Sequence, residues 1–361
     1  MERKDNPRQD ELTFEACAPE DYPVLLKFLD RAFSCKSKLW FANYMGHIFR
    51  PEKKYIAMNL VCRRKGAITG AIGIYPFKLR IGKAVLEAGG IGSVSVAPEE
   101  RGKGIMSFML REVNRRMRES GYDLSWLGGD RFRYRNYGWD QKGRTAVFRI
   151  KRRDVERYRA DFEKTNLIPG SKVPLNELLT MYNRFFSGAV RNKALFNVHL
   201  SRKKYAWRAV KGSGGFAYCA FDRGNPENIV EIQGDPESVV SLLHAHFRKS
   251  GRHWCRIVYP CDERDPVFML LHSICADFLM VHNNQIQIIN VDSLWKKLVP
   301  ELAEWYGDSK VLTSIGNPED RRMVLERALG FFNNVPEFPK RLSKLSKIQP
   351  IPWWYSPVDQ V

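Results

Sequence analysis

Residues 94–106 have the sequence VSVAPEERGKGIM. A strand that Pro98 ends is followed by a glycine-rich turn and a helix whose apolar residues recur at helical spacing from Ile105 to Met117. Such a helix start points several backbone N–H groups at one spot, and the helix dipole favours an anion there. The stretch therefore predicts a phosphate-binding turn. A plain strand–turn–helix with a basic cap is the alternative, since glycine-rich turns are common.

The elements around this stretch predict one α/β unit. We expect a strand at 12–16, a helix that opens at 19–21, a second helix at 37–49, strands at 55–63, 67–75 and 86–96, the helix at 102–120, a strand at 122–127, a short helix at 130–136 and a strand at 145–150. The three middle strands follow one another through tight turns, which predicts antiparallel pairing.

A second cycle of similar layout follows a charged helical linker at 151–166. It comprises helices at 174–186 and 194–201, strands at 205–210, 216–222 and 229–233, a helix at 236–249, a strand at 255–259, a helix at 266–274 and a hairpin at 278–291. We therefore divide the chain into a tail (1–10), a first domain (11–150), the linker, a second domain (167–291) and a C-terminal region (292–361) with two helices and a proline-rich, apolar end.

The first domain resembles the GNAT acetyltransferase superfamily. Arg101, Gly102, Lys103 and Gly104 resemble its arginine-x-x-glycine-x-glycine pyrophosphate loop, with Met106 at the usually small sixth position. The segment from Tyr134 to Trp139, YRNYGW, resembles a second motif of the enhanced intracellular survival (Eis) branch. This resemblance implies a mixed, mostly antiparallel GNAT sheet flanked by helices, in a tandem of an intact and a degenerate GNAT-like domain.

The resemblance also implies a site. Acetyl-CoA is the expected co-substrate, with its pantetheine arm along the strand and its diphosphate on the turn: Val94, Ser95, Val96, Arg101, Gly102, Lys103, Gly104, Ile105, Met106 and Ser107. Tyr134 is the expected general acid for the leaving thiolate, with a packed helix tyrosine as the alternative. The C-terminal carboxylate of Val361 is a candidate base, and a free surface terminus is its alternative. Glu87 fits an exposed turn carboxylate better than a base.

The resulting prediction is an N-acetyltransferase that moves an acetyl group to a small amine by direct transfer in a ternary complex. An acyl-CoA-sensing module with a polyanion partner is one alternative. A tRNA-dependent aminoacyl transferase is another, but the intact loop argues against it. The net charge of +19 (59 basic minus 40 acidic residues) attracts anions in general and matches polycationic acceptors poorly, so the acceptor stays open. No nucleic-acid motif indicates a polyanion.

The remaining features narrow the class of protein. No apolar run predicts a membrane span. The seven cysteines are scattered without disulfide or zinc spacing, which is typical of buried thiols in a reducing cytoplasm. The histidines at 244, 246 and 253 form no ligand pattern, so we expect no metal.

The resemblance favours a homo-oligomer. In the second domain the corresponding turn contains Asp235 and Pro236, which predicts that it binds no coenzyme A.

Overall fold

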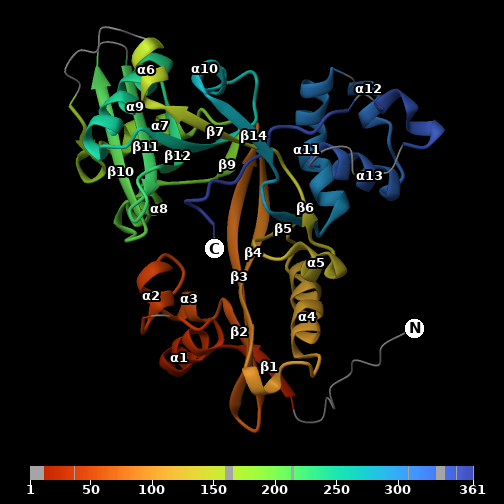
Figure 1. The fold of residues 1–361 in the computed structure, drawn as a ribbon. Coiled ribbons are helices and arrows are strands. Elements are labelled where there is room, and N and C mark those ends of the chain that lie inside the picture. Colours follow the sequence, from red (N-terminus) through yellow and green to blue (C-terminus); the bar gives the residue numbers. More distant parts are fainter. Residues whose placement is uncertain are drawn as a thin grey trace.

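The computed structural model describes residues 12–35, 37–158, 166–212, 215–307, 309–330, 338–346 and 348–360. Two mostly antiparallel sheets with helices packed around them form the fold (Figure 1). The mixed α/β class that the sequence predicted is confirmed. No helix among the described residues has both the length and the apolar character that crossing a membrane requires.

The first sheet has eight strands in the order β1-β2-β3-β4-β5-β15-β6, and β9 pairs with β3. Only β4 and β5 run parallel, and every other pair is antiparallel. The strands are β1 (Leu12–Ala16), β2 (Asn59–Arg64), β3 (Ala67–Ile81), β4 (Ala84–Val96), β5 (Leu124–Leu127), β6 (Asp140–Gln141), β9 (Ser187–Ala189) and β15 (Gln285–Ile288).

The second sheet has seven strands in the order β14-β7-β13-β12-β11-β10-β8. Here β12 and β13 are the parallel pair, as β4 and β5 are in the first sheet. The strands are β7 (Thr145–Lys151), β8 (Ile168–Pro169), β10 (Tyr205–Gly212), β11 (Gly215–Asp222), β12 (Asn228–Gly234), β13 (Trp254–Pro260) and β14 (Asp277–Val281).

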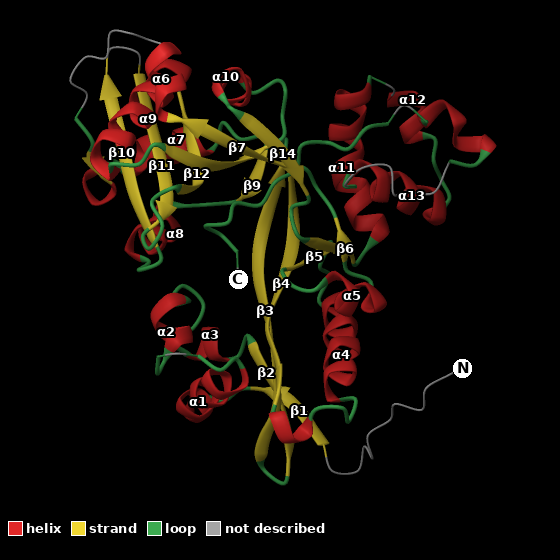
Figure 2. Cartoon of the chain, viewed as in Figure 1, coloured by secondary structure: helices red, strands yellow, loops and turns green. Residues whose placement is uncertain are grey.

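Helices cover both sheets (Figure 2). Beside the first sheet lie α1 (Tyr22–Ala32), α2 (Trp40–Tyr44), α3 (Lys53–Ile56), α4 (Ile105–Glu119), α5 (Arg131–Tyr134), α11 (Val291–Tyr306), α12 (Ser309–Thr313) and α13 (Pro318–Ala328). Beside the second lie α6 (Arg152–Tyr158), α7 (Leu175–Tyr182), α8 (Lys193–Ser201), α9 (Pro236–Ser250) and α10 (Pro266–Ile274). Short 3-10 turns are η2 (Pro19–Asp21), η3 (Pro98–Glu100), η4 (Arg135–Tyr137), η5 (Gly170–Lys172) and η6 (Lys340–Leu345).

Two predicted elements were wrong. The helix expected at 37–49 is reduced to the five residues of α2, which begins after Leu39 in the left-handed region (φ +56°) and ends at Met45, where the backbone leaves the helical region (φ −112°). The hairpin expected at 278–291 does not form: β14 pairs with β7 in the second sheet, and β15 pairs with β5 in the first. Each strand pairs apolar residues with its neighbour. Phe278 of β14 packs against Phe148 of β7, and Ile286 of β15 lies opposite Trp126 of β5.

The two sheets therefore exchange strands. β7 precedes the expected linker but belongs to the second sheet, and β15 comes after nearly all of the second sheet but belongs to the first. The C-terminal segment also joins the two cores, because Trp353 and Tyr355 pack in the first whereas Trp354 and Val358 pack in the second. In Figure 1 this segment accordingly runs near β3, in the centre of the molecule.

Candidate active site

The predicted phosphate turn joins β4 to α4. After η3 the chain passes through Gly102 and Gly104, whose φ angles of +77° and +76° lie in the left-handed region that favours glycine. Gly104 is the N-cap of α4, and no side chain caps the helix. The first amides of a helix have no partner within it, so those that follow Gly104 are available to an external acceptor.

A hollow of about 650 Å³ lies over this turn. It is lined by every residue predicted to bind the co-substrate except Lys103, and in addition by Ala32, Phe33, Glu100 and Arg133. The structure thus gathers the C-terminal end of β4, the turn and the first turn of α4 around one space. The residues at 32 and 33 close it from the end of α1, which the sequence pattern did not indicate.

The charges near the hollow are partly compensated. Lys103 Nζ lies 3.1 Å from Glu100 Oε1, so its charge is directed at that carboxylate. Arg101 donates to the Ala32 carbonyl (3.3 Å), which ties the turn to the end of α1. Arg133, on α5, lines the hollow as a further cation. It stands directly before Tyr134, next to the motif segment.

The strand beside the hollow, β4, diverges from its neighbour β5. β4 pairs with β5 only from Ala88 to Ile91, whereas β4 itself continues to Val96. The edge of β4 from Gly92 onward thus has no partner in β5, which ends at Leu127. An extended ligand can add to such an edge by main-chain hydrogen bonds.

A β-bulge lies on this free part of β4. Gly92 pairs with Gly73 and Ser95 with Ala71, so Ser93 and Val94 oppose the single residue Ile72. Ser93 takes a φ of +51°, and its hydroxyl lies 2.7 Å from that of Tyr75. A bulge leaves its extra residue outside the ladder and re-aims the backbone, which provides an N–H near Val94 that can point into the wedge between β4 and β5.

Tyr134 lies near this wedge but does not line the hollow. Its side chain is buried at the end of α5, where it packs in the same core as Ile91 and Leu127. Burial raises the pKa of Tyr134, so its phenol stays protonated at neutral pH. A protonated phenol can donate a proton, which is the property that a general acid requires.

The rest of the YRNYGW segment fixes α4 against the sheet. The Tyr137 hydroxyl lies 2.5 Å from Ser107 Oγ, and Asn114 donates to the Tyr137 carbonyl (3.0 Å). Trp139 is fully buried and donates to Ser125 Oγ (3.0 Å), a residue of β5. The segment therefore holds the first turn of α4 and the strand beside it in one arrangement.

The two candidate bases differ in position. Glu87 is 48% exposed and forms an ion pair with Lys78 (2.9 Å) across the hairpin, as expected for a surface carboxylate. Val361 lies outside the described residues. The residue before it, Gln360, is partly buried and lies next to His47, from the loop after α2.

The equivalent turn of the second sheet has another chemistry. After β12, Asp235 accepts from the Phe216 amide (2.9 Å) and forms an ion pair with Arg184 (2.8 Å). Pro236 then starts α9 without an N–H group. The hollow beside this turn, of about 490 Å³, is lined by Asp262 and Asp265 as well as by arginines. These carboxylates disfavour a diphosphate.

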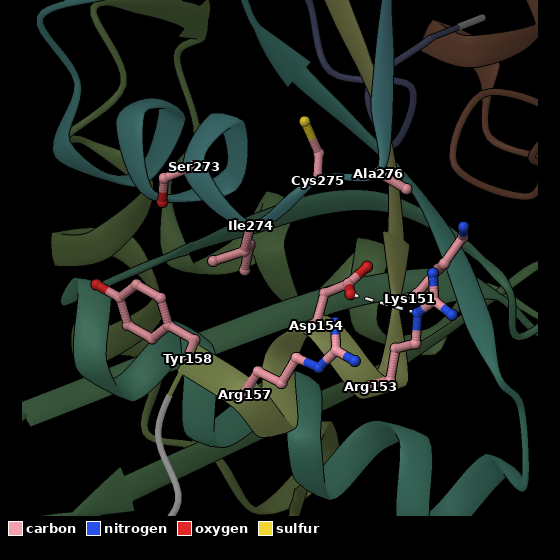
Figure 3. A pocket seen from close by; sticks show the side chains of 9 residues that line it. All are labelled: Lys151, Arg153, Asp154, Arg157, Tyr158, Ser273, Ile274, Cys275 and Ala276. Carbon is pink, nitrogen blue, oxygen red and sulfur yellow. Dashed lines mark ion pairs between the residues drawn. The ribbon is translucent and has the colours of Figure 1, made fainter.

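Another hollow, of about 510 Å³, lies between α6 and the loop that follows α10 (Figure 3). Its cationic side chains are Lys151, Arg153 and Arg157, and Arg153 forms an ion pair with Asp154 (3.5 Å). It shares no residue with the turn at 101–104.

Among the described residues, no three or more histidine, cysteine, aspartate or glutamate side chains are arranged so that they could hold a metal ion. All seven cysteines are free thiols, and five of them are buried.

Comparisons with known proteins agree with this geometry. Residues 15–141 match the family model described as an acetyltransferase (GNAT) domain. No curated protein matches the chain.

Several solved structures share the fold. A probable N-acyltransferase from Enterococcus faecalis is 16% identical, with a TM-score of 0.62 over 79% of this chain and 74% of that one. A GCN5-related N-acetyltransferase from Kribbella flavida is 16% identical (TM-score 0.59; 77% and 72% covered). Eis1 from Mycobacterium abscessus is 13% identical (TM-score 0.56; 78% and 75% covered). At these identities the similarity concerns the fold.

Proposed function

We propose, from the GNAT acetyltransferase domain that residues 15–141 constitute, that this protein is an acetyl-CoA-dependent N-acetyltransferase acting on a small amine. The domain match supports acyl transfer as the class of reaction. The observation that carries the proposal is the uncapped start of α4 on two left-handed glycines, beside the free edge of β4.

The residues of the hollow fit coenzyme A. The amides from Gly102 to Ser107 would hold its diphosphate, with Arg101 and Arg133 adding positive charge. The edge from Val94 to Val96 would hold the pantetheine arm as an added strand. When bound, acetyl-CoA supplies an acyl group activated as a thioester.

The chain's own groups then have three tasks. The N–H near Val94 stabilises the negative charge that develops on the thioester oxygen when the amine attacks. Tyr134 donates its proton to the thiolate that leaves. A base takes the proton of the attacking amine, and we assign this task to the carboxylate of Val361, whose neighbour Gln360 lies beside His47. Bond formation to nitrogen and loss of sulfur occur in one ternary complex.

The test is an assay of free thiol release from acetyl-CoA with a panel of primary amines, and mass spectrometry of the product. We expect an amine-dependent release and a product 42 Da heavier, as one acetyl group requires. A variant with one residue appended after Val361 should lose at least tenfold in kcat, and an appended residue without effect would refute the assignment of the base. Binding of acetyl-CoA without release for any amine would refute the enzyme proposal.

One observation favours a second candidate function. The hollow in Figure 3 gathers three cationic side chains around one carboxylate, which suits an anionic partner better than an amine. A polyanion-binding module predicts retention on heparin that weakens steeply with salt, together with no acyl transfer. Retention on heparin that does not depend on salt, together with acyl transfer, would instead support the first proposal.

A further inference from the structure

A hollow of about 550 Å³ lies beside the second sheet, where α9 packs on β10 and β11 (Figure 1). Its cations are Arg208 of β10, and Arg248 and Lys249 of the last turn of α9. Among the described residues that line it there is no aspartate or glutamate, whereas each of the three hollows described above has at least one. This α9 hollow therefore has the most one-sided charge of the four.

Arg208 is the cation that an ordinary surface does not explain. It stands in the middle of β10, half-buried, and its guanidinium lies 4.6 Å from the centroid of the Phe221 ring. Within the described part of the chain no carboxylate forms an ion pair with it. Burial lowers the pKa of Arg208, as expected for a cation that is partly withdrawn from water without an anionic partner. An anion in the hollow would remove that cost.

A buried histidine holds the guanidinium in place. His246 Nε2 lies 2.9 Å from the Pro226 carbonyl, which can only accept, so Nε2 carries the proton and donates. Nδ1 is then an acceptor, and Arg208 Nη1 donates to it (3.0 Å). The described residues give the guanidinium no other hydrogen bond, so its remaining N–H groups are available to a ligand.

The other two cations strengthen the case only together with Arg208. Arg248 and Lys249 are exposed, and the end of a helix favours positive charge, so by themselves they are ordinary. They line the same space as Arg208, however, and none of the described carboxylates lies among the three. Like charges around one space repel each other, and an oxyanion that enters it replaces this repulsion with charge-assisted hydrogen bonds.

The rest of the lining selects the kind of anion. It is mostly apolar and includes Leu167, Pro169, Ala206, Phe221 and Ala245. Pro169 belongs to β8 and lies opposite Arg208 in the sheet, so the apolar surface directly adjoins the cation. A volume of about 550 Å³ is in the usual range of small-molecule sites, which combine apolar walls with a few polar groups. A bare inorganic ion would leave these walls uncovered.

We propose that the α9 hollow is a binding site for a small organic anion, whose oxyanion group meets Arg208 and whose apolar body covers Phe221 and its neighbours. A phosphate or a carboxylate can supply the oxyanion, because the planar guanidinium matches both. The site shares no residue with the hollow at the phosphate turn. The inference is therefore independent of the proposed acyl transfer and stands or falls by binding alone.

Three probes and two variants test the proposal. Phenyl phosphate has the oxyanion and the apolar body, inorganic phosphate lacks the body, and benzoate replaces the phosphate with a carboxylate. Arg208→Gln removes the half-buried charge. Arg248→Gln removes an exposed charge from the same hollow, and its exposure gives it little reason to affect folding. Equilibrium dialysis of the full chain gives Kd and the number of molecules bound, and circular dichroism checks that each variant is folded.

Two controls exclude the other places where an anion could bind. Arg157→Gln removes one cation from the hollow in Figure 3, and Gly104→Asp places a carboxylate on the phosphate turn. Neither residue lines the α9 hollow. If phenyl phosphate bound at one of those places, the corresponding control would lose it.

We expect one phenyl phosphate per chain, bound about tenfold more tightly than inorganic phosphate. Arg208→Gln should raise its Kd about tenfold or more and Arg248→Gln about threefold, with both controls within about twofold of the wild type. Tighter binding of benzoate than of phenyl phosphate would support the site and assign it to a carboxylate. No binding at millimolar concentration, or loss in a control but not in Arg208→Gln, overturns the proposal. If Arg208→Gln does not fold, an unchanged Kd in Arg248→Gln overturns it.

Discussion

Replacing Gly104 with aspartate is the sharpest test of the phosphate turn. The new carboxylate would stand at the start of α4, where the free amides converge. Two unit charges about 4 Å apart interact by about 1 kcal/mol in water and about 4 kcal/mol near a protein surface, and a diphosphate carries more than one charge. A loss of about 3 kcal/mol in acetyl-CoA binding is therefore expected, which raises Kd more than 100-fold.

The same substitution has little reason to unfold the protein. A left-handed φ costs a residue with a side chain about 1–2 kcal/mol. An aspartate at a helix N-terminus returns about 0.3–1 kcal/mol through the helix dipole. The two contributions oppose each other, and both act on the free protein as well as on the complex. We therefore expect Gly104→Asp to lose acetyl-CoA binding while the protein stays folded.

Two control variants separate charge from backbone strain. Gly104→Asn has nearly the same size without the charge, and we expect its Kd to rise less than about fivefold. Gly121→Asp introduces the same residue at an equal φ of +76°, beyond the other end of α4 and roughly 25 Å away at 1.5 Å per residue. Titration calorimetry gives the affinities of the wild type and of the three variants. Wild-type affinity in a folded Gly104→Asp protein would refute the assignment of the turn.

Two further predictions concern Tyr134 and His246. Tyr134→Phe should lower kcat about 100-fold with unchanged acetyl-CoA affinity. An unchanged kcat would remove Tyr134 from the mechanism. The control is Tyr137→Phe, which loses only a contact to Ser107. Burial, with Arg208 nearby, lowers the pKa of His246 to about 4 from 6.5. The unfolded chain then binds more protons than the folded one between these values, so His246 alone should lower the free energy of unfolding by roughly 2 kcal/mol from pH 7 to pH 5. Other histidines with a lowered pKa, such as His199, add to the fall. In urea titrations His246→Gln should remove only its own share, and an equally steep profile in the variant would contradict the assignment.

The sequence was informative where local pattern and chemistry coincide. A strand, two glycines and an amphipathic helix at 94–106 determine one geometry by themselves, and the hollow forms there. Arg133 was adjacent to a motif residue and was accessible to the same reasoning. The exposure of Glu87 agrees with its interpretation as a surface carboxylate, whereas its partner Lys78 lay beyond the strand predicted at 67–75.

The sequence was uninformative where partners come from distant segments. The four residues of β15 have no pattern that selects one sheet over the other, and their pairing with β5 depends on a core built from three parts of the chain. Arg191, Glu231 and Asp359 lie far apart in the sequence, and nothing in the residues next to them distinguishes them from surface charges. Their mutual contact, in which the buried Arg191 guanidinium donates to both carboxylates, is a property of the packed fold, so no spacing rule could have found it.

The exchange of strands makes a last prediction about folding. A fragment of residues 1–150 contains all the residues that match the acetyltransferase model, yet it lacks β15, α11, α13 and the C-terminal segment. Without them β5 becomes an edge strand, and Trp126, which is 2% exposed in the full chain, loses Ile286 and Tyr355 as cover.

Burial of a large side chain contributes about 1.5–3 kcal/mol, and several more side chains of the same core are uncovered at once, so the loss approaches the whole stability of a small domain. We therefore expect the fragment to be unfolded or aggregated, whereas the full chain should melt in one calorimetric transition. A soluble fragment with native circular dichroism and acetyl-CoA binding would show that the first sheet is independent after all.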